Sequence, residues 1–157
     1  MALAVLVGAL TGCSVAAPES RLDVYEARAE DISAELIAQL PTATAVRTDS
    51  RAWINQTEWF VPSERQVAHW TAESTIEFAG DTASVAAALG THLVTEDWTA
   101  ESIVESDGAH SDVYRLGDKD VGGDGEWIVE VQWQDGRDLL LMVQSPVTVR
   151  GTEEAAE

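Results

Sequence analysis

The segment after Trp127 constrains the fold more than any other part of the chain. From Trp127 to Gln134, hydrophobic and polar side chains alternate, and the Asp135-Gly136 pair follows directly. A period of two residues predicts a β-strand with one buried face, and Asp-Gly at the end of such a strand is a strong signal for a tight hairpin. We therefore expect residues 138–143 to return as an antiparallel partner strand.

A second alternating segment and two helical patterns predict three further elements. Residues His69–Phe78 alternate, which predicts a half-buried strand. Apolar residues recur at steps of three and four over Arg21–Leu40, which predicts an amphipathic helix with Ser20 as its N-cap. Asp81 is expected to cap a second helix over Ala83–Val94.

The remaining segments have weaker patterns. A loop is expected over residues 42–50, and a polar, Gly-rich loop over residues 117–125. Further short strands are predicted over residues 51–59, 98–106 and 112–116, and along an edge over residues 147–150. Together these elements predict an α+β fold, in which a twisted antiparallel sheet of about four to six strands has two helices packed on one face and solvent on the other.

The N-terminal residues have the form of a bacterial lipobox. Met1–Leu10 is an uncharged hydrophobic run that has the length of a signal-peptide core and is too short to span a bilayer. Leu10-Thr11-Gly12-Cys13 ends this run, and Cys13 is the only cysteine of the chain. This motif resembles the lipobox of bacterial lipoproteins, whose signal peptide is cleaved before the cysteine and whose cysteine thiol bears a diacylglycerol. The resemblance implies lipid attachment at Cys13.

The same resemblance divides the chain into segments. Residues 1–12 are expected to be a signal peptide, residues 13–19 the lipidated cysteine and a tether, residues 20–150 a single α+β domain, and residues 151–157 a disordered acidic tail. Secretory signals have an N-terminal region that contains Lys or Arg, and here only the amino group of Met1 is positive, so we expect the true start to lie upstream. The order of elements over residues 20–150 resembles that of small actinobacterial lipoproteins of the LppA-like kind, which implies location and fold but no catalytic residue.

The net charge limits the partners. The chain has 28 acidic and 9 basic residues, for a formal charge of −19, and the acidic residues are spread along its length. Such a surface repels nucleic acid and bare anionic headgroups. We therefore expect no nucleic-acid partner, and membrane association only through the lipid on Cys13. A cationic partner is compatible with this charge.

Two groups of residues resemble metal sites. Residues 118–126 suggest a calcium loop, but Gly122 and Val129 stand where an EF-hand needs ligands, so a polar connection between strands is the favoured interpretation. His92 and Glu96 could place two zinc ligands on one helix face, but the sequence shows no third ligand, and an ordinary helix-end histidine is favoured. We therefore expect no metal and no cofactor.

Paired carboxylates are the candidates for acid–base chemistry. Glu101 with Glu105, or Glu73 with Glu77, could act as acid and base. In so acidic a chain, however, solvated strand faces are the favoured interpretation of both pairs. The chain also lacks a Gly-x-Ser-x-Gly nucleophile motif. No catalytic residue is therefore predicted.

The six tryptophans fall into two groups. Those on the inward faces of the alternating strands are expected in the core: Trp70, Trp127 and Trp133. The others lie near loops or strand starts, where an exposed pair could form a platform for a sugar, peptide or protein: Trp53, Trp59 and Trp98.

The sequence therefore favours a lipid-anchored protein on the extracytoplasmic face of the cell membrane. Its domain is expected to be a non-catalytic binding or interaction module at the cell envelope, with an envelope protein or glycan as partner. Two alternatives stay open. A partly buried pair of carboxylates in a cleft would favour an envelope-acting hydrolase, and self-association would favour a purely structural assembly factor.

Overall fold

The structure is a computed structural model of the chain. It describes residues 19–41, 45–54, 66–77, 80–106, 108–117, 125–134 and 136–150, with the side chains of residues 102–106 left out. The lipobox with Cys13, most of the expected tether and the expected acidic tail all lie outside the described residues. None of the helices in the described part of the chain is long and apolar enough to cross a membrane.

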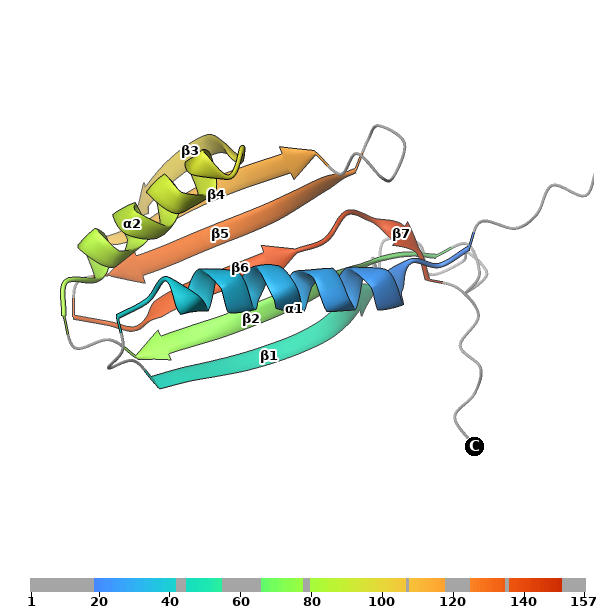
Figure 1. The fold of residues 1–157 in the computed structure, drawn as a ribbon, viewed down its shortest axis with the longest axis horizontal. Coiled ribbons are helices and arrows are strands. Elements are labelled where there is room, and N and C mark those ends of the chain that lie inside the picture. The colour runs from blue at the N-terminus through green and yellow to red at the C-terminus, as the bar shows by residue number, and fades with distance from the viewer. Residues whose placement is uncertain are drawn as a thin grey trace, which may run out of the picture.

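The described residues form two helices and seven strands (Figure 1). The helices are α1 (Leu22–Ala38) and α2 (Thr82–Thr95). The strands are β1 (Ala45–Ile54), β2 (Val67–Glu77), β3 (Thr99–Ser106), β4 (Ala109–Gly117), β5 (Glu126–Gln134), β6 (Leu139–Gln144) and β7 (Thr148–Val149).

All strands belong to one antiparallel sheet with the order β1-β2-β6-β5-β4-β3. The predicted α+β class and antiparallel sheet are confirmed. The described sheet has one strand more than expected because two-residue β7 pairs with β2 beyond the end of β6. Residues 145–147 separate β6 from β7. Within them the Ser145 hydroxyl accepts a hydrogen bond from the Trp70 N–H at 2.8 Å, which maintains the link to β2 across the interruption.

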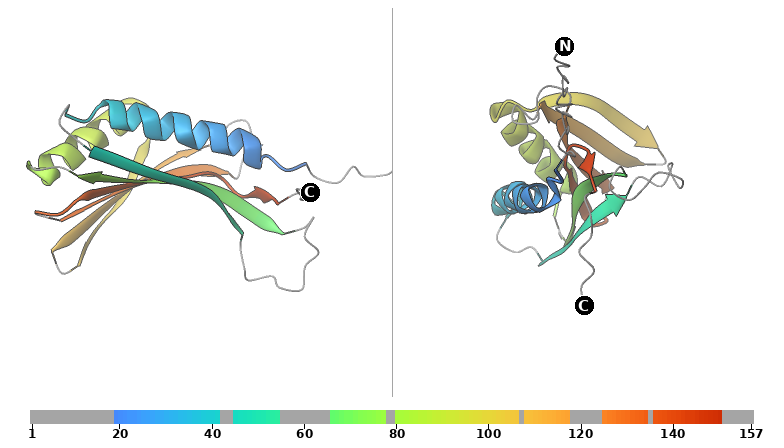
Figure 2. Two further views of the ribbon diagram at one scale, coloured as in Figure 1. Left: turned by 90° about the horizontal axis from the view of Figure 1, so that it is seen from below. Right: turned by 90° about the vertical axis from the view of Figure 1, so that its right-hand side faces the viewer.

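Both helices pack on the same face of the sheet, as predicted (Figure 2). α1 lies mainly over β2 and β6, and α2 lies mainly over β5. The core fills the space between the helices and the sheet, and its largest fully buried side chains include Tyr25, Leu36, Leu89, Leu93, Leu139 and Leu141. The opposite face of the sheet has no described helix over it.

The hairpin predicted at Asp135-Gly136 is present. β5 and β6 pair antiparallel, and Gly136 has a φ of +70°, a conformation that glycine adopts without the clash that a Cβ would cause. Val129 and Val131 on β5 are completely buried, and Trp127 is 5% exposed. The predicted inward face of β5 is therefore confirmed.

Of the two predicted helix caps, one is confirmed and one is wrong. Asp81 is the N-cap of α2 as predicted, and its carboxylate accepts a hydrogen bond from the Ser84 N–H at 3.2 Å. A hydrogen bond from the Ser84 hydroxyl, and after it the bond from the Ser84 N–H, lower the pKa of Asp81. The predicted Ser20 cap of α1 is wrong by one residue: Arg21 is the N-cap, and the Ser20 hydroxyl accepts from the Leu22 N–H at 3.4 Å.

The first strand was placed wrongly from the sequence. A loop was expected over residues 42–50 and a strand over 51–59, whereas β1 spans Ala45–Ile54. Residues 55–59 lie outside the described residues. The position of β1 depends on pairing with β2, which matches all ten of its residues without a register shift. Because β1 is exposed along nearly its whole length, burial imposes no alternation that the sequence could display.

Candidate functional site

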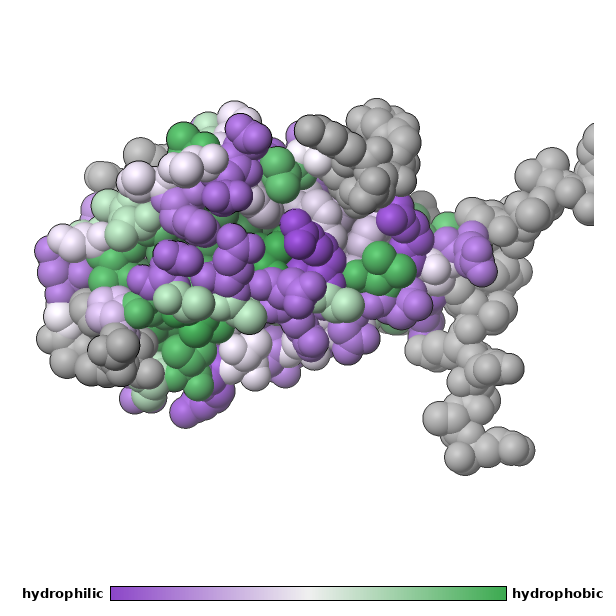
Figure 3. Space-filling model, viewed as in Figure 1, coloured by the Kyte–Doolittle hydropathy of each residue, from purple (hydrophilic) through white to green (hydrophobic). Residues whose placement is uncertain are grey.

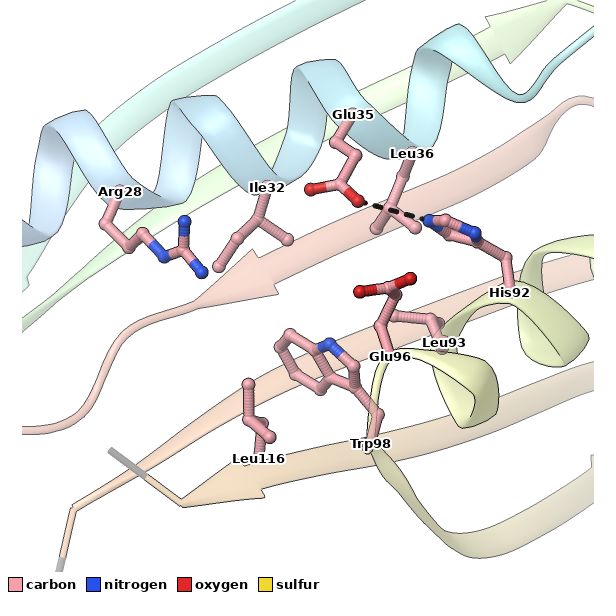
Figure 4. Close-up of a pocket in the computed structure, with 9 residues that line it drawn as sticks. All are labelled: Arg28, Ile32, Glu35, Leu36, His92, Leu93, Glu96, Trp98 and Leu116. Atoms are coloured by element: carbon pink, nitrogen blue, oxygen red, sulfur yellow. Dashed lines mark hydrogen bonds and ion pairs between the residues drawn. The ribbon is translucent and has the colours of Figure 1, made fainter. Parts of the chain in front are cut away.

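A groove separates α1 from α2 on the helical face of the molecule. We call it the α1–α2 groove, and it is lined by Arg28, Ile32, Glu35, Leu36, His92, Leu93, Glu96, Trp98 and Leu116 (Figure 4). In the space-filling view, hydrophobic surface is visible between the two helices and is bordered by hydrophilic side chains (Figure 3). The groove therefore combines an apolar floor with a charged rim.

One face of α1 forms one wall of this groove. Arg28, Ile32, Glu35 and Leu36 follow one another at steps of three, four or one residue, which places them on neighbouring positions of one helix face. Leu36 is 2% exposed and Ile32 is 5% exposed, so both belong to the core beneath the groove. One face of α1 therefore contributes both buried residues to the core and exposed residues to the rim of the groove.

The end of α2 supplies the other wall. Asp97 has a φ of +66°, and the Trp98 N–H donates to the Leu93 carbonyl at 3.0 Å. The Asp97 N–H donates to the Val94 carbonyl at 3.3 Å. These two bonds form a Schellman motif, which ends the helix and brings the residue after the turn back against its last turn. Trp98 is thereby folded under the groove and is 7% exposed.

A hydrogen bond between His92 and Glu35 joins the two walls. His92 Nε2 lies 3.3 Å from Glu35 Oε1, and the two residues are 57 positions apart in the sequence. The Glu35 side chain is 54% exposed and the His92 side chain 24% exposed. Glu96 is exposed and projects from the α2 side of the groove (Figure 4). The carboxylates of the rim are therefore solvated.

The groove is small. Its cavity volume is about 90 Å³, whereas sites that enclose a drug-sized molecule have volumes of about 300–1,000 Å³. A space of this size accommodates several water molecules or one side chain of a partner. The geometry therefore fits recognition of a protruding group better than enclosure of a whole small molecule.

His92 and Glu96, which the sequence analysis weighed as zinc ligands without favouring that interpretation, lie together in the structure. His92 and Glu96 both line the groove, and Glu35 from α1 joins them, which the sequence did not indicate. However, no cluster of three or more His, Cys, Asp or Glu residues with metal-binding geometry occurs within the described residues. Most of the loop predicted to resemble a calcium site, residues 118–124, lies outside them.

The two predicted carboxylate pairs are in different environments. Glu73 and Glu77 are both exposed on β2, as expected for a solvated strand face. The Arg115 Nε donates a hydrogen bond to the Glu101 carboxylate, and the Arg115 Nη1 lies 3.2 Å from the Glu126 carboxylate. These carboxylates raise the pKa of Arg115, chiefly through its hydrogen bond with Glu101. The side chain of Glu105 lies outside the described residues.

The tryptophans predicted as a possible platform do not meet as a pair in the described structure. Trp98 is buried, Trp53 is 45% exposed on β1, and Trp59 lies outside the described residues. The Arg51 guanidinium lies over the Trp53 ring at 4.3 Å from its centroid. Trp127 is in the core as predicted, and Trp70 and Trp133 are partly buried against it.

A row of polar side chains on β4 was not recognised from the sequence. His110, Asp112 and Tyr114 alternate on the strand face beneath α2, and His110 stacks on Trp133 with 5.0 Å between the ring centroids. Burial raises the pKa of Asp112, although the hydrogen bond from Tyr114 opposes this shift. Burial also raises the pKa of Tyr114. The alternation over residues 110–114 was the available signal, but it was interpreted only as a short strand.

Among the carboxylates of the described residues, Asp112 is the one with a clearly raised pKa. One of its oxygens, Oδ1, is buried and has no hydrogen-bond partner within the described structure. Asp112 does not line the α1–α2 groove. We therefore treat the β4 row as part of the packing beneath α2 and the groove as the candidate binding site.

The sequence matches no known protein-family model, and comparison with curated proteins finds no match either.

Proposed function

We propose that this protein is a lipoprotein anchored through Cys13 to the extracytoplasmic face of the cell membrane. Its domain is a non-catalytic module that holds a cationic side chain of an envelope protein in the α1–α2 groove. The lipobox Leu10-Thr11-Gly12-Cys13 supports the anchor. The main support for the binding role is the groove itself, with its small volume, its apolar floor and a rim on which the solvated carboxylates of Glu35 and Glu96 stand beside Arg28 and His92.

The groove chemistry favours a Lys or Arg side chain. Its aliphatic stem would pack on Leu36 and the Trp98 ring, and its charged end would meet the carboxylates of Glu35 and Glu96. A cation near an indole ring gains further attraction from the ring quadrupole. The net charge of −19 would also accelerate the approach of a basic partner.

The anchor is tested by replacing Cys13 in the native host. Wild type is expected to lose residues 1–12, to gain the mass of two or three acyl chains and to fractionate with membranes. Cys13→Ala is expected to remain unacylated and to leave the membrane fraction, because each buried CH₂ of an acyl chain contributes about 0.8 kcal/mol to anchoring. Ser14→Ala is the matched control and should behave as wild type. An unprocessed, soluble wild-type protein would contradict the anchor.

The binding role is tested by a photoreactive amino acid placed in the groove. At position 35, on the rim, it should form a discrete adduct with one envelope protein in the native host. At position 30, which is exposed on α1 and does not line the groove, it should not. A glycan adduct at position 35 would replace the protein partner in the proposal. Equal labelling from both positions would contradict a role for the groove.

A further inference from the structure

The sheet has two outer strands, and they differ in how open they are to further pairing. β3 contains a register shift between Ala100 and Ser102 in its pairing with β4, and a bulge of this kind disfavours addition of another strand. β1 pairs with β2 over ten residues without any shift. Along its other edge, β1 has no partner strand among the described residues. β1 is therefore the more open edge.

β1 has only part of the usual protection of an edge strand. Proline and charged side chains, especially lysine, commonly block pairing at an edge. β1 contains neither proline nor lysine, and its charged residues are Arg47, Asp49 and Arg51. Every residue of β1 except Ser50 is exposed, and three of its large hydrophobic side chains remain 36–45% exposed: Val46, Trp53 and Ile54. A long, regular strand with this much exposed apolar surface is suited to pairing with another strand.

The sequence of β1 is complementary to itself. If two copies pair antiparallel with Ser50 opposite Ser50, then Asp49 lies opposite Arg51 of the second copy, twice by symmetry. In the same register Arg47 lies opposite Trp53, and Val46 lies opposite Ile54. Opposite charges, a cation beside an aromatic ring and apolar pairs are the cross-strand combinations that stabilise sheets.

The neighbouring registers are worse. Antiparallel pairing across a two-fold axis keeps each residue on its own face, so the centre can move only by whole residues along β1. A centre at Asp49 places Asp49 opposite itself and Arg47 opposite Arg51. A centre at Arg51 places Arg51 opposite itself. Like charges directly opposite each other are destabilising, so the charges disfavour both of these registers. A centre at Thr48 would also pair Asp49 with an arginine, but within β1 it pairs only residues 45–51 and leaves Trp53 and Ile54 outside the contact. Charge and paired length together favour the register centred on Ser50.

We propose that two copies of this chain associate through β1, in an antiparallel pair centred on Ser50 that continues the sheet from one molecule into the other. The partner of this surface is thus a second copy of the chain, and the contact is isologous. The inference does not depend on the proposed groove ligand or on the lipid. On a membrane, confinement of anchored molecules would favour the pair further.

The charges provide the first test. In the full chain with Cys13→Ser, which prevents disulfides through Cys13, sedimentation equilibrium measures the dimer dissociation constant. Asp49→Arg and Arg51→Asp each turn two attractive cross-strand pairs into two repulsive ones, and each should weaken the dimer about tenfold or more. The double variant Asp49→Arg/Arg51→Asp should dimerise as the parent does.

Mixing the two single variants is the sharpest control. In the proposed register, the arginine introduced at position 49 of one variant would face the aspartate introduced at position 51 of the other. The unchanged Arg51 of the first variant would likewise face the unchanged Asp49 of the second. The mixture should therefore form a heterodimer, although neither variant dimerises well alone.

The charge variants are not expected to disturb folding. The contact between Asp49 and Arg51 within one strand is 3.7 Å long and joins exposed side chains, so it contributes little to stability. The variants should therefore fold as the parent does, which circular dichroism checks.

A disulfide reports the register directly. Directly opposite residues of antiparallel strands have Cα atoms about 4.5–5.5 Å apart, within the range that a disulfide spans. Ser50→Cys in the Cys13→Ser chain should therefore form a disulfide-linked dimer on mild oxidation. Thr48→Cys, on the same face, is the control, because residues 48 of the two copies would lie about 13 Å apart along the strands.

The outcomes that would overturn the inference are distinct. A chain that stays monomeric at every concentration excludes the dimer. A dimer that is indifferent to the single charge variants, or single variants that do not combine on mixing, places the association on another surface. Crosslinking that is as fast through Thr48→Cys as through Ser50→Cys excludes the register. None of these results bears on the groove, whose test uses positions 35 and 30.

Discussion

Gly90 lies in α2 directly against Tyr114 of β4, and this contact makes a quantitative prediction. Gly90 is buried, and a Cβ added to it would lie 3.0 Å from the Tyr114 Cζ and closer still to the hydroxyl oxygen. In a free helix, replacing glycine with alanine stabilises by about 1 kcal/mol. Here the new methyl group must displace a side chain that is itself packed in the core, which typically costs about 1–3 kcal/mol.

The two effects oppose each other, so the expected result depends on Tyr114. In wild type, Gly90→Ala should lower the free energy of unfolding by about 0–2 kcal/mol, the clash less the helix gain. In a Tyr114→Phe background the hydroxyl is gone, and what remains is a tight contact at Cζ, 3.0 Å away, and an ordinary one at Cε1, 3.6 Å away. There Gly90→Ala should be neutral or stabilising by up to about 1 kcal/mol.

Urea denaturation of the four chains of this cycle measures the coupling. Tyr114→Phe also removes the hydrogen bond to Asp112, but that loss is common to both chains that carry this substitution and cancels in the cycle. The coupling energy is expected to be positive and no larger than about 3 kcal/mol. If Gly90→Ala stabilises equally in both backgrounds, helix propensity alone explains the site and the close approach of α2 to β4 is refuted.

Two further predictions concern the core and the pH dependence of folding. Leu141 is fully buried, and Leu140 is half-buried on the other face of β6. Measured by thermal or urea unfolding, Leu141→Ala should lower the free energy of unfolding by about 2–5 kcal/mol, and Leu140→Ala by half of that or less. Equal losses of stability would contradict the one-sided core. Burial raises the pKa of Asp112 above its ordinary value of 3.8, so the folded protein favours the protonated carboxyl group. The stability that comes from this preference is fully present below the unfolded pKa and is lost as pH rises through the folded pKa. Asp112→Asn should therefore unfold at a higher temperature than wild type at neutral pH, and this advantage should disappear below about pH 4; an advantage independent of pH would show that the charge of Asp112 is not its cause.

Where structure follows from contacts close in sequence, the sequence predicted it well. The helical period of α1, the Asp81 cap of α2 and the Asp135-Gly136 hairpin each depend on residues within a few positions of one another. The alternation of β2 and β5 identified their buried faces for the same reason, because one side of each strand meets the core. β1 has no such burial, and its position became evident only from its partner strand.

The candidate site was predicted less well, because its walls come from distant parts of the chain. His92 and Glu96 were recognised as neighbours on one helix, but Glu35 lies 57 residues before His92 and belongs to another helix. Trp98 was placed near a loop or strand start, as one of three tryptophans of which an exposed pair could form a platform, whereas the Schellman turn at Asp97 folds it into the core. The packing of α1 beside α2 on one face of the sheet decides both outcomes.

The sequence by itself determined the fold class and the buried faces of the regular strands, and it carries the lipobox-like motif Leu10-Thr11-Gly12-Cys13 on which the proposed location depends. These are properties of periodicity, turns and short motifs, which act locally along the chain. Only the tertiary structure decided the order of the strands, the groove between the helices and the open edge at β1. These features arise where residues far apart in sequence are brought together by burial of the core, and no local pattern encodes which surfaces will then meet.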